Sequence, residues 1–214
     1  MKHFTSSLEF SHIPVMLSEV IHISSPSKGG KFLDCTFGGG GYSRALLNFP
    51  KTNVTAIDRD ASVYSLANKL ENKFKDRFKF YQIKFSQLDE ISINKIDVII
   101  FDLGISSIQL KNLKRGFSFN SKDKLDMSMG LSKISAQEVI NKMSETNLKL
   151  IFQILGEENE ASKIAKNIVK ARLEKQITRV HELVSIIIKS KKKIFSSKIN
   201  PCTKTFQALR IFVN

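Results

Sequence analysis

Cysteine is scarce in this sequence. Of 214 residues only Cys35 and Cys202 are cysteines, and they lie far apart without Cys-x-x-Cys spacing or a neighbouring histidine cluster. This pattern excludes a disulfide framework and indicates no zinc site. We therefore expect a reducing compartment and no metal.

Long apolar runs are missing as well. The first ten residues mix Lys2, His3 and Glu9 with isolated apolar residues, so they lack the apolar core of a signal peptide or a membrane span. No internal repeat or long low-complexity tract stands out. These absences predict a soluble, cytoplasmic protein with no membrane partner; they leave the oligomeric state open.

Acidic residues are few relative to basic ones. Lys and Arg number 34 against 20 Asp and Glu, which gives a formal net charge of +14. A field of this sign favours polyanions such as RNA or DNA as partners. A proteome that simply prefers lysine would produce the same excess, so charge alone leaves both interpretations open.

Between residues 32 and 101, short apolar runs alternate with amphipathic stretches, as in βαβ units that build a parallel sheet. The run Ile-Asp-Val-Ile-Ile-Phe at 96–101 is almost continuously apolar and predicts the clearest buried strand. The economical fold is an α/β, Rossmann-like one. The predicted strands are 31–36, 53–57, 78–83 and 96–101, and the predicted helices are 42–48 and 61–73.

Beyond about residue 110 the pattern becomes helical and predicts a separate helical module. Ser135 and Glu138 have capping-box spacing before an apolar run. The lysine-rich stretch 189–193 predicts either contact with RNA phosphates or a solvated helix end. Three apolar stripes predict core faces: Leu148, Ile151, Phe152 and Leu155; Ala161, Ile164, Ala165, Ile168 and Val169; and Leu183, Val184, Ile187 and Ile188.

The strongest local signal is the glycine-rich stretch from Asp34 to Ser43, which lies between a predicted strand and a predicted helix. Such a loop lets the backbone approach a nucleotide cofactor closely, although an ordinary structural turn is the alternative. Asp58 follows Gly38 by twenty residues. A carboxylate at this position accepts hydrogen bonds from the ribose hydroxyls of a nucleotide cofactor. This spacing fits NAD or S-adenosylmethionine, and Asp34 beside the loop favours the zwitterionic end of the latter over a pyrophosphate.

Asp102 directly follows the last predicted strand. Ligands in open α/β sheets lie beyond the carboxyl ends of the strands, so we expect Asp102 to point into the site. The alternative is that Asp102 caps a following turn.

At these residues the sequence resembles the bacterial ribosomal RNA small-subunit methyltransferase H family, also called MraW. The resemblance covers nearly the whole chain and rests on several ordered motifs. They are 12–15, 34–43, 57–60, 102–110, 115–119, 125–127, 156–158 and 203–211.

The resemblance implies a class I (Rossmann-like) S-adenosylmethionine-dependent methyltransferase with an inserted all-helical domain. The implied reaction is methylation of N4 of a cytidine in small-subunit (16S) rRNA. The resemblance leaves open whether the substrate is the free RNA or the RNA within the assembled subunit. The implied domains are 1–110 for the cofactor-binding half, 111–203 for the insertion and 204–214 for a return to the methyltransferase domain. The residues implied at the cofactor site are Gly40, Gly41, Tyr42, Asp58, Phe85, Asp102 and Gln109.

The implied roles are specific. Asp58 would hold the ribose, Phe85 would pack near the adenine, and the glycines would admit the methionine end. We assign Asp102, or backbone carbonyls beside it, as the catalytic acceptor for the cytosine amine. Arg115, Phe117 and Asp126 would lie where the insertion meets the cleft, and Phe117 and Phe119 either stack on RNA bases or anchor the insertion.

The chain departs from the family pattern in places. Tyr42 replaces a usual His, Lys111 a usual Asp, Lys124 a usual Pro and Ser128 a usual Arg, while Lys204 replaces an Arg and loses its bidentate fork. Family members continue past Asn214, so the sequence resembles a truncated member with an unfinished sheet. Two rival functions remain: an NAD-dependent oxidoreductase and a non-catalytic RNA-binding or assembly protein.

Overall fold

The structure is a computed structural model that describes residues 14–93, 95–191 and 199–214. The chain divides into two compact units, residues 1–106 and residues 107–214. We call them the sheet unit and the helical unit.

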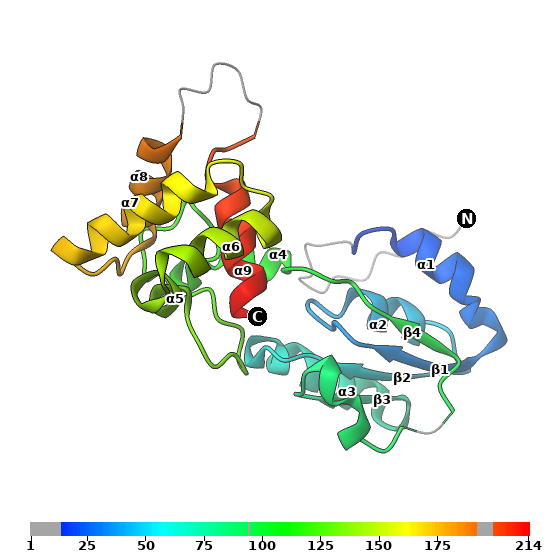
Figure 1. Cartoon of the computed structure of the whole chain (residues 1–214). Helices are drawn as coiled ribbons and strands as arrows, with labels where there is room; N and C mark the ends of the chain where they lie inside the picture. Colours follow the sequence, from blue (N-terminus) through cyan, green and yellow to red (C-terminus); the bar gives the residue numbers. More distant parts are fainter. Residues whose placement is uncertain (1–13, 94, 192–198) are drawn as a thin grey trace. The chain divides into compact units, whose positions relative to one another are not determined.

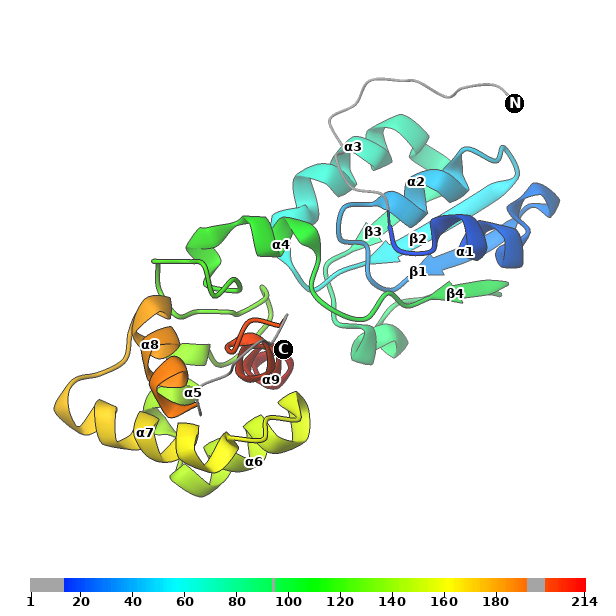
Figure 2. The ribbon, with the colours of Figure 1, turned by 90° about the horizontal axis from the view of Figure 1, so that it is seen from above.

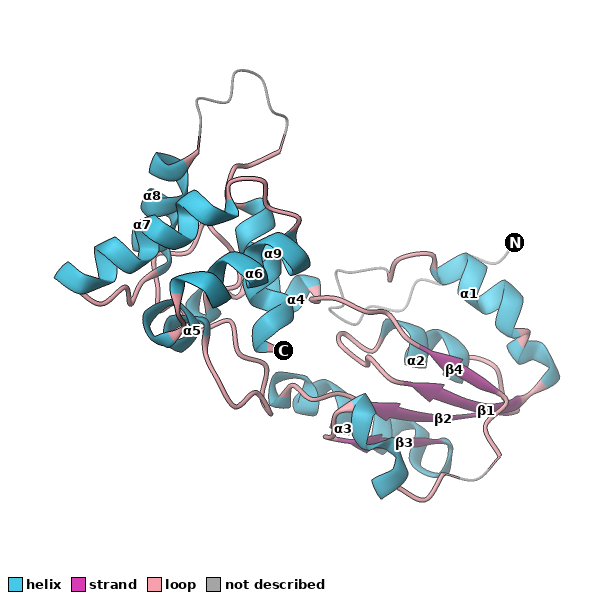
Figure 3. Cartoon of the chain, viewed as in Figure 1, coloured by secondary structure: helices cyan, strands magenta, loops and turns pink. Residues whose placement is uncertain are grey.

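The sheet unit is built on a four-stranded parallel sheet with the order β3-β2-β1-β4 (Figures 1 and 3). Leu33 in the inner strand β1 lies beside Thr55 of β2 on one side and Ile99 of β4 on the other. This topology is the Rossmann-like arrangement that the sequence predicts, and the predicted strands and helices are all found. Their bounds are β1 Gly30–Asp34, α2 Gly41–Leu47, β2 Thr52–Ile57, α3 Tyr64–Phe74, β3 Phe78–Tyr81 and β4 Val98–Ile100. The described part of the sheet unit also contains the α-helix α1 Leu17–Ser24 and short 3-10 helices.

One face of the sheet is covered by helices. Phe32, Val54 and Phe78 project from three adjacent strands into a core shared with Leu46 of α2 and Ala67 of α3. Helix α1 packs against the same cluster, and Figure 2 shows it beside α2. On the opposite face a smaller cluster of buried residues consists of Leu33, Cys35 and Ile57. The partly buried side chains that pack against it are Tyr81, Ile83, Leu88, Ile91, Ile93 and Ile96.

Strand β4 differs from its prediction. The regular strand covers only Val98–Ile100, at an edge of the sheet, and Ile99 and Phe101 are 52% and 49% exposed. A continuous apolar run is buried only where both faces are covered. Here the α-helices cover the face that carries Ile100, whereas the segment that buries Leu33 does not extend over Ile99.

The helical unit follows the predicted pattern. Ser135 and Glu138 form the reciprocal capping box at the start of α5. The predicted stripes supply the buried faces of α6, α7 and α8, with the exception of Ile188, which is exposed at the margin of its stripe. The helices are α4 Ser107–Lys111, α5 Ala136–Lys142, α6 Glu145–Gly156, α7 Ala161–Glu174, α8 Val180–Ser190 and α9 Thr203–Val213.

The two compact units divide after Ser106, close to the boundary expected at residue 110. Residues 204–214 lie in the helical unit, and their assignment to the methyltransferase domain stays a prediction. Helix α9 (Thr203–Val213) packs closely on α6. A Cβ added to Gly156 would lie 2.4 Å from the Lys204 carbonyl oxygen, so only glycine allows this approach.

One lysine of the lysine-rich stretch 189–193, Lys191, forms an ion pair inside the helical unit. Lys191 Nζ lies 2.7 Å from Glu158 Oε2, with both side chains largely buried, and Thr205 donates to the same oxygen at 3.1 Å. Lys191 is therefore neither a phosphate contact nor a solvated charge, because it neutralises a buried carboxylate. Lys192 and Lys193 lie outside the described residues.

Within the described ranges, no helix is both long and apolar enough to span a bilayer.

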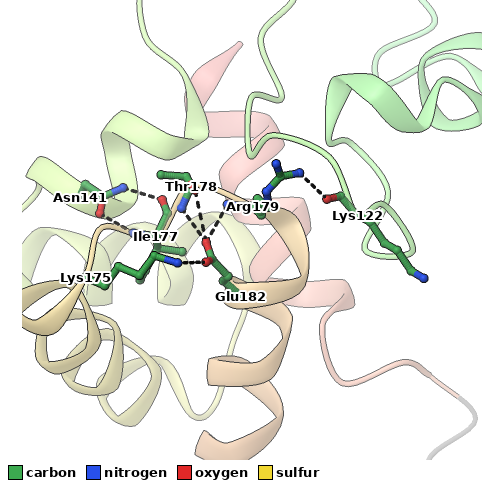
Figure 4. Close-up of polar contacts among 7 residues, drawn as sticks. All are labelled: Lys122, Asn141, Lys175, Ile177, Thr178, Arg179 and Glu182. Atoms are coloured by element: carbon green, nitrogen blue, oxygen red, sulfur yellow. Dashed lines mark hydrogen bonds and ion pairs between the residues drawn. The ribbon is translucent and has the colours of Figure 1, made fainter.

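The start of α8 is fixed by Glu182 (Figure 4). Its carboxylate accepts hydrogen bonds from the backbone amides of Thr178 at 2.8 Å and Arg179 at 2.9 Å, and Lys175 Nζ lies 3.1 Å away. The Thr178 amide chiefly, with the Arg179 amide and Lys175, lowers the pKa of Glu182 to about 2. Asn141 adds two hydrogen bonds to the backbone of Ile177.

We expect Glu182→Gln to destabilise the helical unit by about 1 kcal/mol at pH 7, since charge-assisted bonds to the cap amides are lost. The folded-state pKa lies below the ordinary 4.5, so the contribution is present above pH 4.5 and is lost as the pH falls towards 2. Urea unfolding at pH 7 and pH 3.5 measures the difference. The matched control is Glu174→Gln, at an exposed position at the end of α7. An equal penalty at both pH values would contradict the electrostatic account.

Candidate functional site

The glycine-rich loop joins β1 to α2 and is closed by a carboxylate from β2. The Gly38 amide donates to Asp58 Oδ2 at 2.8 Å, and the Asp60 amide donates to Oδ1 at 2.9 Å. Asp58 directly follows β2, so the bond from Gly38 ties together the carboxyl ends of two parallel strands, and the bond from Asp60 fixes the turn after β2. Burial raises the pKa of Asp58, and the backbone amides oppose the rise.

Gly40 meets a steric requirement in this loop. It caps α2 in the left-handed conformation, with φ of 69°, and a Cβ there would lie 2.8 Å from the Phe37 ring. Gly41 is constrained differently, because a Cβ there would lie 2.1 Å from Cγ of Pro14. Both glycines are therefore required by the packing of the sheet unit itself, whether or not a bound ligand also requires them.

A second carboxylate lies beneath the loop. Asp34, at the end of β1, is fully buried and accepts a hydrogen bond from Ser43 Oγ of α2 at 2.7 Å. Burial raises the pKa of Asp34 to about 6, although the Ser43 hydroxyl and the Thr36 amide both favour the ionised form. Because the folded-state pKa exceeds the ordinary 3.8, ionising Asp34 costs stability as the pH rises through this range.

Asp102 lies beyond the end of β4 and is joined to the same loop. Its backbone amide donates to Thr36 Oγ1 at 2.8 Å, and its side chain is exposed. Tyr42, the first-turn residue of α2, is buried with its hydroxyl donating to the Val15 carbonyl oxygen. Burial chiefly, and then the nearby carboxylates of Asp102 and Asp34, raises the pKa of Tyr42.

Phe85 and Phe101 form an aromatic pair at the same end of the sheet. Their ring centroids are 5.8 Å apart with an interplanar angle of 87°, and both rings are about half exposed. Phe101 directly precedes Asp102, so the pair adjoins the acidic loop. An exposed aromatic edge beside a polar loop suits a flat heterocycle.

The structure brings six of the seven predicted cofactor-site residues together within the sheet unit. They are Gly40, Gly41, Tyr42, Asp58, Phe85 and Asp102. The seventh, Gln109, is buried on α4 in the helical unit.

The residues predicted to border the cleft from the insertion also belong to the helical unit. Phe117 is fully buried, with the Arg115 guanidinium 5.1 Å from its ring centroid, which confirms it as a packing anchor. Phe119 is half-buried and packs edge-to-face on Phe206. The Asp126 carboxylate accepts a hydrogen bond from Ser128.

The sequence interpretation missed Thr36, Ser43 and Phe101. Thr36 lies two residues after Asp34, at the end of a predicted strand. Its position could have indicated this role, because short polar side chains there commonly form hydrogen bonds with neighbouring backbone. Ser43 carries no comparable signal, because its partner is nine residues away. Phe101 was assigned to a buried strand and was therefore not considered as a partner of Phe85.

The arrangement favours a cationic ligand. Three carboxylates, those of Asp34, Asp58 and Asp102, surround the loop, and one loop amide is already engaged by Asp58. Among residues 14–93, 95–191 and 199–214, no group of three His, Cys, Asp or Glu side chains is placed to hold a metal ion. The polar groups at the loop are carboxylates, hydroxyls and backbone amides.

Comparison with known proteins identifies relatives. Residues 9–214 match the MraW methylase family. Three curated relatives are each named Ribosomal RNA small subunit methyltransferase H, and each match covers 95% of this chain. They come from Ehrlichia ruminantium strain Welgevonden at 43% identity, Maricaulis maris at 42% and Bartonella bacilliformis at 43%. The chain spans 69%, 62% and 61% of their respective lengths.

We expect Gly40→Ala to destabilise the sheet unit more than Gly38→Ala. Both positions have positive φ, which costs about 1 kcal/mol for alanine, but only at Gly40 does the added Cβ meet an aromatic ring closer than 3 Å. The nearest atom at Gly38 is 3.7 Å away. Thermal unfolding of the two variants gives the comparison. Equal losses would show that backbone conformation alone, and not the Phe37 contact, requires glycine.

Proposed function

Because the chain belongs to the MraW methylase family, we propose that it binds S-adenosylmethionine at the carboxyl end of its sheet and transfers the methyl group to N4 of a cytidine in small-subunit rRNA. The substrate is the RNA either free or within the assembled subunit, and the reaction takes place in the cytoplasm. The relatives' names support the RNA substrate.

The observation that carries the cofactor assignment is the acidic loop. S-adenosylmethionine has a sulfonium and an ammonium group against one carboxylate, so its net charge is positive, and carboxylates beside the loop attract it. When bound, it supplies an electrophilic methyl group. Asp58 remains able to accept ribose hydroxyls, since each carboxylate oxygen has a further lone pair. The Phe85–Phe101 pair offers an apolar edge for the adenine.

The same loop argues against NAD. A pyrophosphate requires free backbone amides at the loop and helix start. Here the Gly38 amide is bonded to Asp58, and Asp34 lies below with a second carboxylate. A diphosphate would meet these charges at close range, which costs free energy rather than gaining it.

The reaction depends mainly on positioning. A cytosine amine is a weak nucleophile because its lone pair is delocalised into the ring, so it needs in-line approach and an acceptor for its hydrogens. The exposed Asp102 carboxylate, or the backbone carbonyls beside it, is that acceptor in our proposal. The Asp102 position is fixed by the hydrogen bond from its amide to Thr36. After transfer, the amine releases one proton to this acceptor or to water.

We expect Asp58→Asn to weaken S-adenosylmethionine binding by about tenfold, because the cofactor loses one charge-assisted hydrogen bond and the attraction of the Asp58 negative charge. Isothermal titration measures the dissociation constant, with a thermal-shift control against NADH. The matched variant is Asp76→Asn, an exposed residue remote from the loop in sequence and fold. A preference for NADH, or an undiminished affinity in Asp58→Asn, would overturn the cofactor site.

We expect Asp102→Asn to leave cofactor affinity within about threefold but to lower methyl transfer about 100-fold or more, because the positioned acceptor loses its negative charge and one of its two acceptor oxygens. The assay is transfer of labelled methyl to small-subunit rRNA, followed by nucleoside analysis for N4-methylcytidine. A non-catalytic RNA-binding protein would bind the RNA and yield no labelled nucleoside. Full turnover in Asp102→Asn would remove this residue from the mechanism.

A further inference from the structure

Three segments of the helical unit meet at one place on its surface. The segment 113–116 is held against 121–127, because Ser121 Oγ donates to the Leu113 carbonyl oxygen at 2.6 Å and the Met127 amide donates to Arg115 at 2.9 Å. The segment 121–127 is in turn paired with 178–180. The Leu125 amide donates to the Thr178 carbonyl oxygen at 2.9 Å, and the Val180 amide donates to the Asp123 carbonyl oxygen at 3.1 Å.

This pairing places like charges opposite one another. Lys124 and Arg179 are the partners of an antiparallel bridge, and Arg179 Nη1 donates to the Lys122 carbonyl oxygen at 3.3 Å. Directly opposed side chains in such a bridge lie on the same side with Cβ atoms about 5 Å apart, and like charges there repel. Figure 4 shows the Lys122 side chain extending away from the other labelled residues. The side chains of Lys122, Lys124 and Arg179 are all exposed.

The backbone that carries these cations is fixed. Glu182 bonds the amides of Thr178 and Arg179, and Asn141 makes two hydrogen bonds to Ile177 (Figure 4). A cation on an ordered backbone loses less conformational freedom when it binds a ligand than one on a free segment. The bridge therefore keeps Lys124 and Arg179 as neighbours, and a bound anion would reduce the repulsion between them.

The local sequence is strongly basic. Residues 111–124 contain five cations, Lys111, Lys114, Arg115, Lys122 and Lys124, against the single acid Asp123. Arg115 is used internally, since its guanidinium donates to the Ser128 carbonyl oxygen at 2.8 Å and lies over the Phe117 ring. Lys114 is exposed on the adjoining segment. We call Lys114, Lys122, Lys124 and Arg179 the basic bridge surface.

We propose that the basic bridge surface holds the sugar-phosphate backbone of the substrate RNA. Lysines are compact point charges that match phosphates without reading bases, so this surface would position the strand rather than select its sequence. The cations come from three chain segments that are joined by hydrogen bonds, so they can contact more than one phosphate of a strand. This inference rests on the proposed function for the identity of the polyanion.

The test is the triple variant Lys114→Gln/Lys122→Gln/Lys124→Gln, which leaves Arg179 and the cap of α8 intact. The probe is a fluorescein-labelled, unstructured single-stranded RNA, titrated by anisotropy over a series of salt concentrations. We expect about tenfold weaker binding at low salt. The slope of log affinity against log salt should become shallower by about 2, since each single-strand phosphate contact contributes about 0.7.

The matched control is Lys163→Gln/Lys166→Gln/Lys170→Gln, which removes the same charge from exposed positions on α7. Thermal unfolding of both variants confirms that each is folded, and the double variant Lys122→Gln/Lys124→Gln replaces the triple if it is not. Cofactor affinity is measured on the same samples.

Selective loss of RNA affinity in the first variant, with the shallower salt slope, supports the surface. Equal loss in both variants, no loss in either, or absence of RNA binding by the unaltered chain overturns it. Failure of the proposed function is a separate outcome. If the chain binds RNA through these lysines but binds no S-adenosylmethionine, the proposed methyltransferase function is refuted and the proposed RNA-binding surface is still supported.

Discussion

The hydrogen bond between the Gly38 amide and the Asp58 carboxylate is the interaction on which the candidate site depends. It links the carboxyl ends of β1 and β2 at 2.8 Å and fixes the loop that leads into α2. Asp34 and Ser43 hold the loop from below, and Thr36 joins it to the residue after β4. Three strands thus end in one connected polar network, because parallel strands present their carboxyl ends on the same edge of the sheet.

This network also has an electrostatic cost. Burial raises the pKa of both Asp34 and Asp58. The folded state would therefore be stabilised if either carboxylate were neutralised. A cationic ligand supplies such neutralisation, and a diphosphate does the opposite. In our proposal, the carboxylates around the loop favour S-adenosylmethionine over NAD, whereas the spacing of Gly38 and Asp58 alone fits both cofactors.

Much of the sheet unit could be predicted because its signals are local. Alternating apolar runs, a glycine loop after a strand and an acid twenty residues on each follow from short-range geometry, and the structure contains them all. The exposure of Ile99 could not be predicted in this way, since burial depends on whether another element covers that face of β4. The packing partner of α9 could not be predicted for a related reason. Its packing on Gly156 is a long-range contact that no periodicity encodes. Lys191 likewise has the sequence appearance of a solvated charge, and only its buried partner Glu158 shows otherwise.

The proposed S-adenosylmethionine site lies where β1, β2 and β4 end. Two-dimensional amide NMR of the isotope-labelled chain, recorded during titration with S-adenosylmethionine, locates the bound cofactor without a substitution. We expect saturable shifts concentrated at the amides of Gly38, Gly40, Asp58 and Asp102, with α6 and α7 unchanged. Shifts confined to the helical unit, or none at a saturating concentration of cofactor, would contradict it.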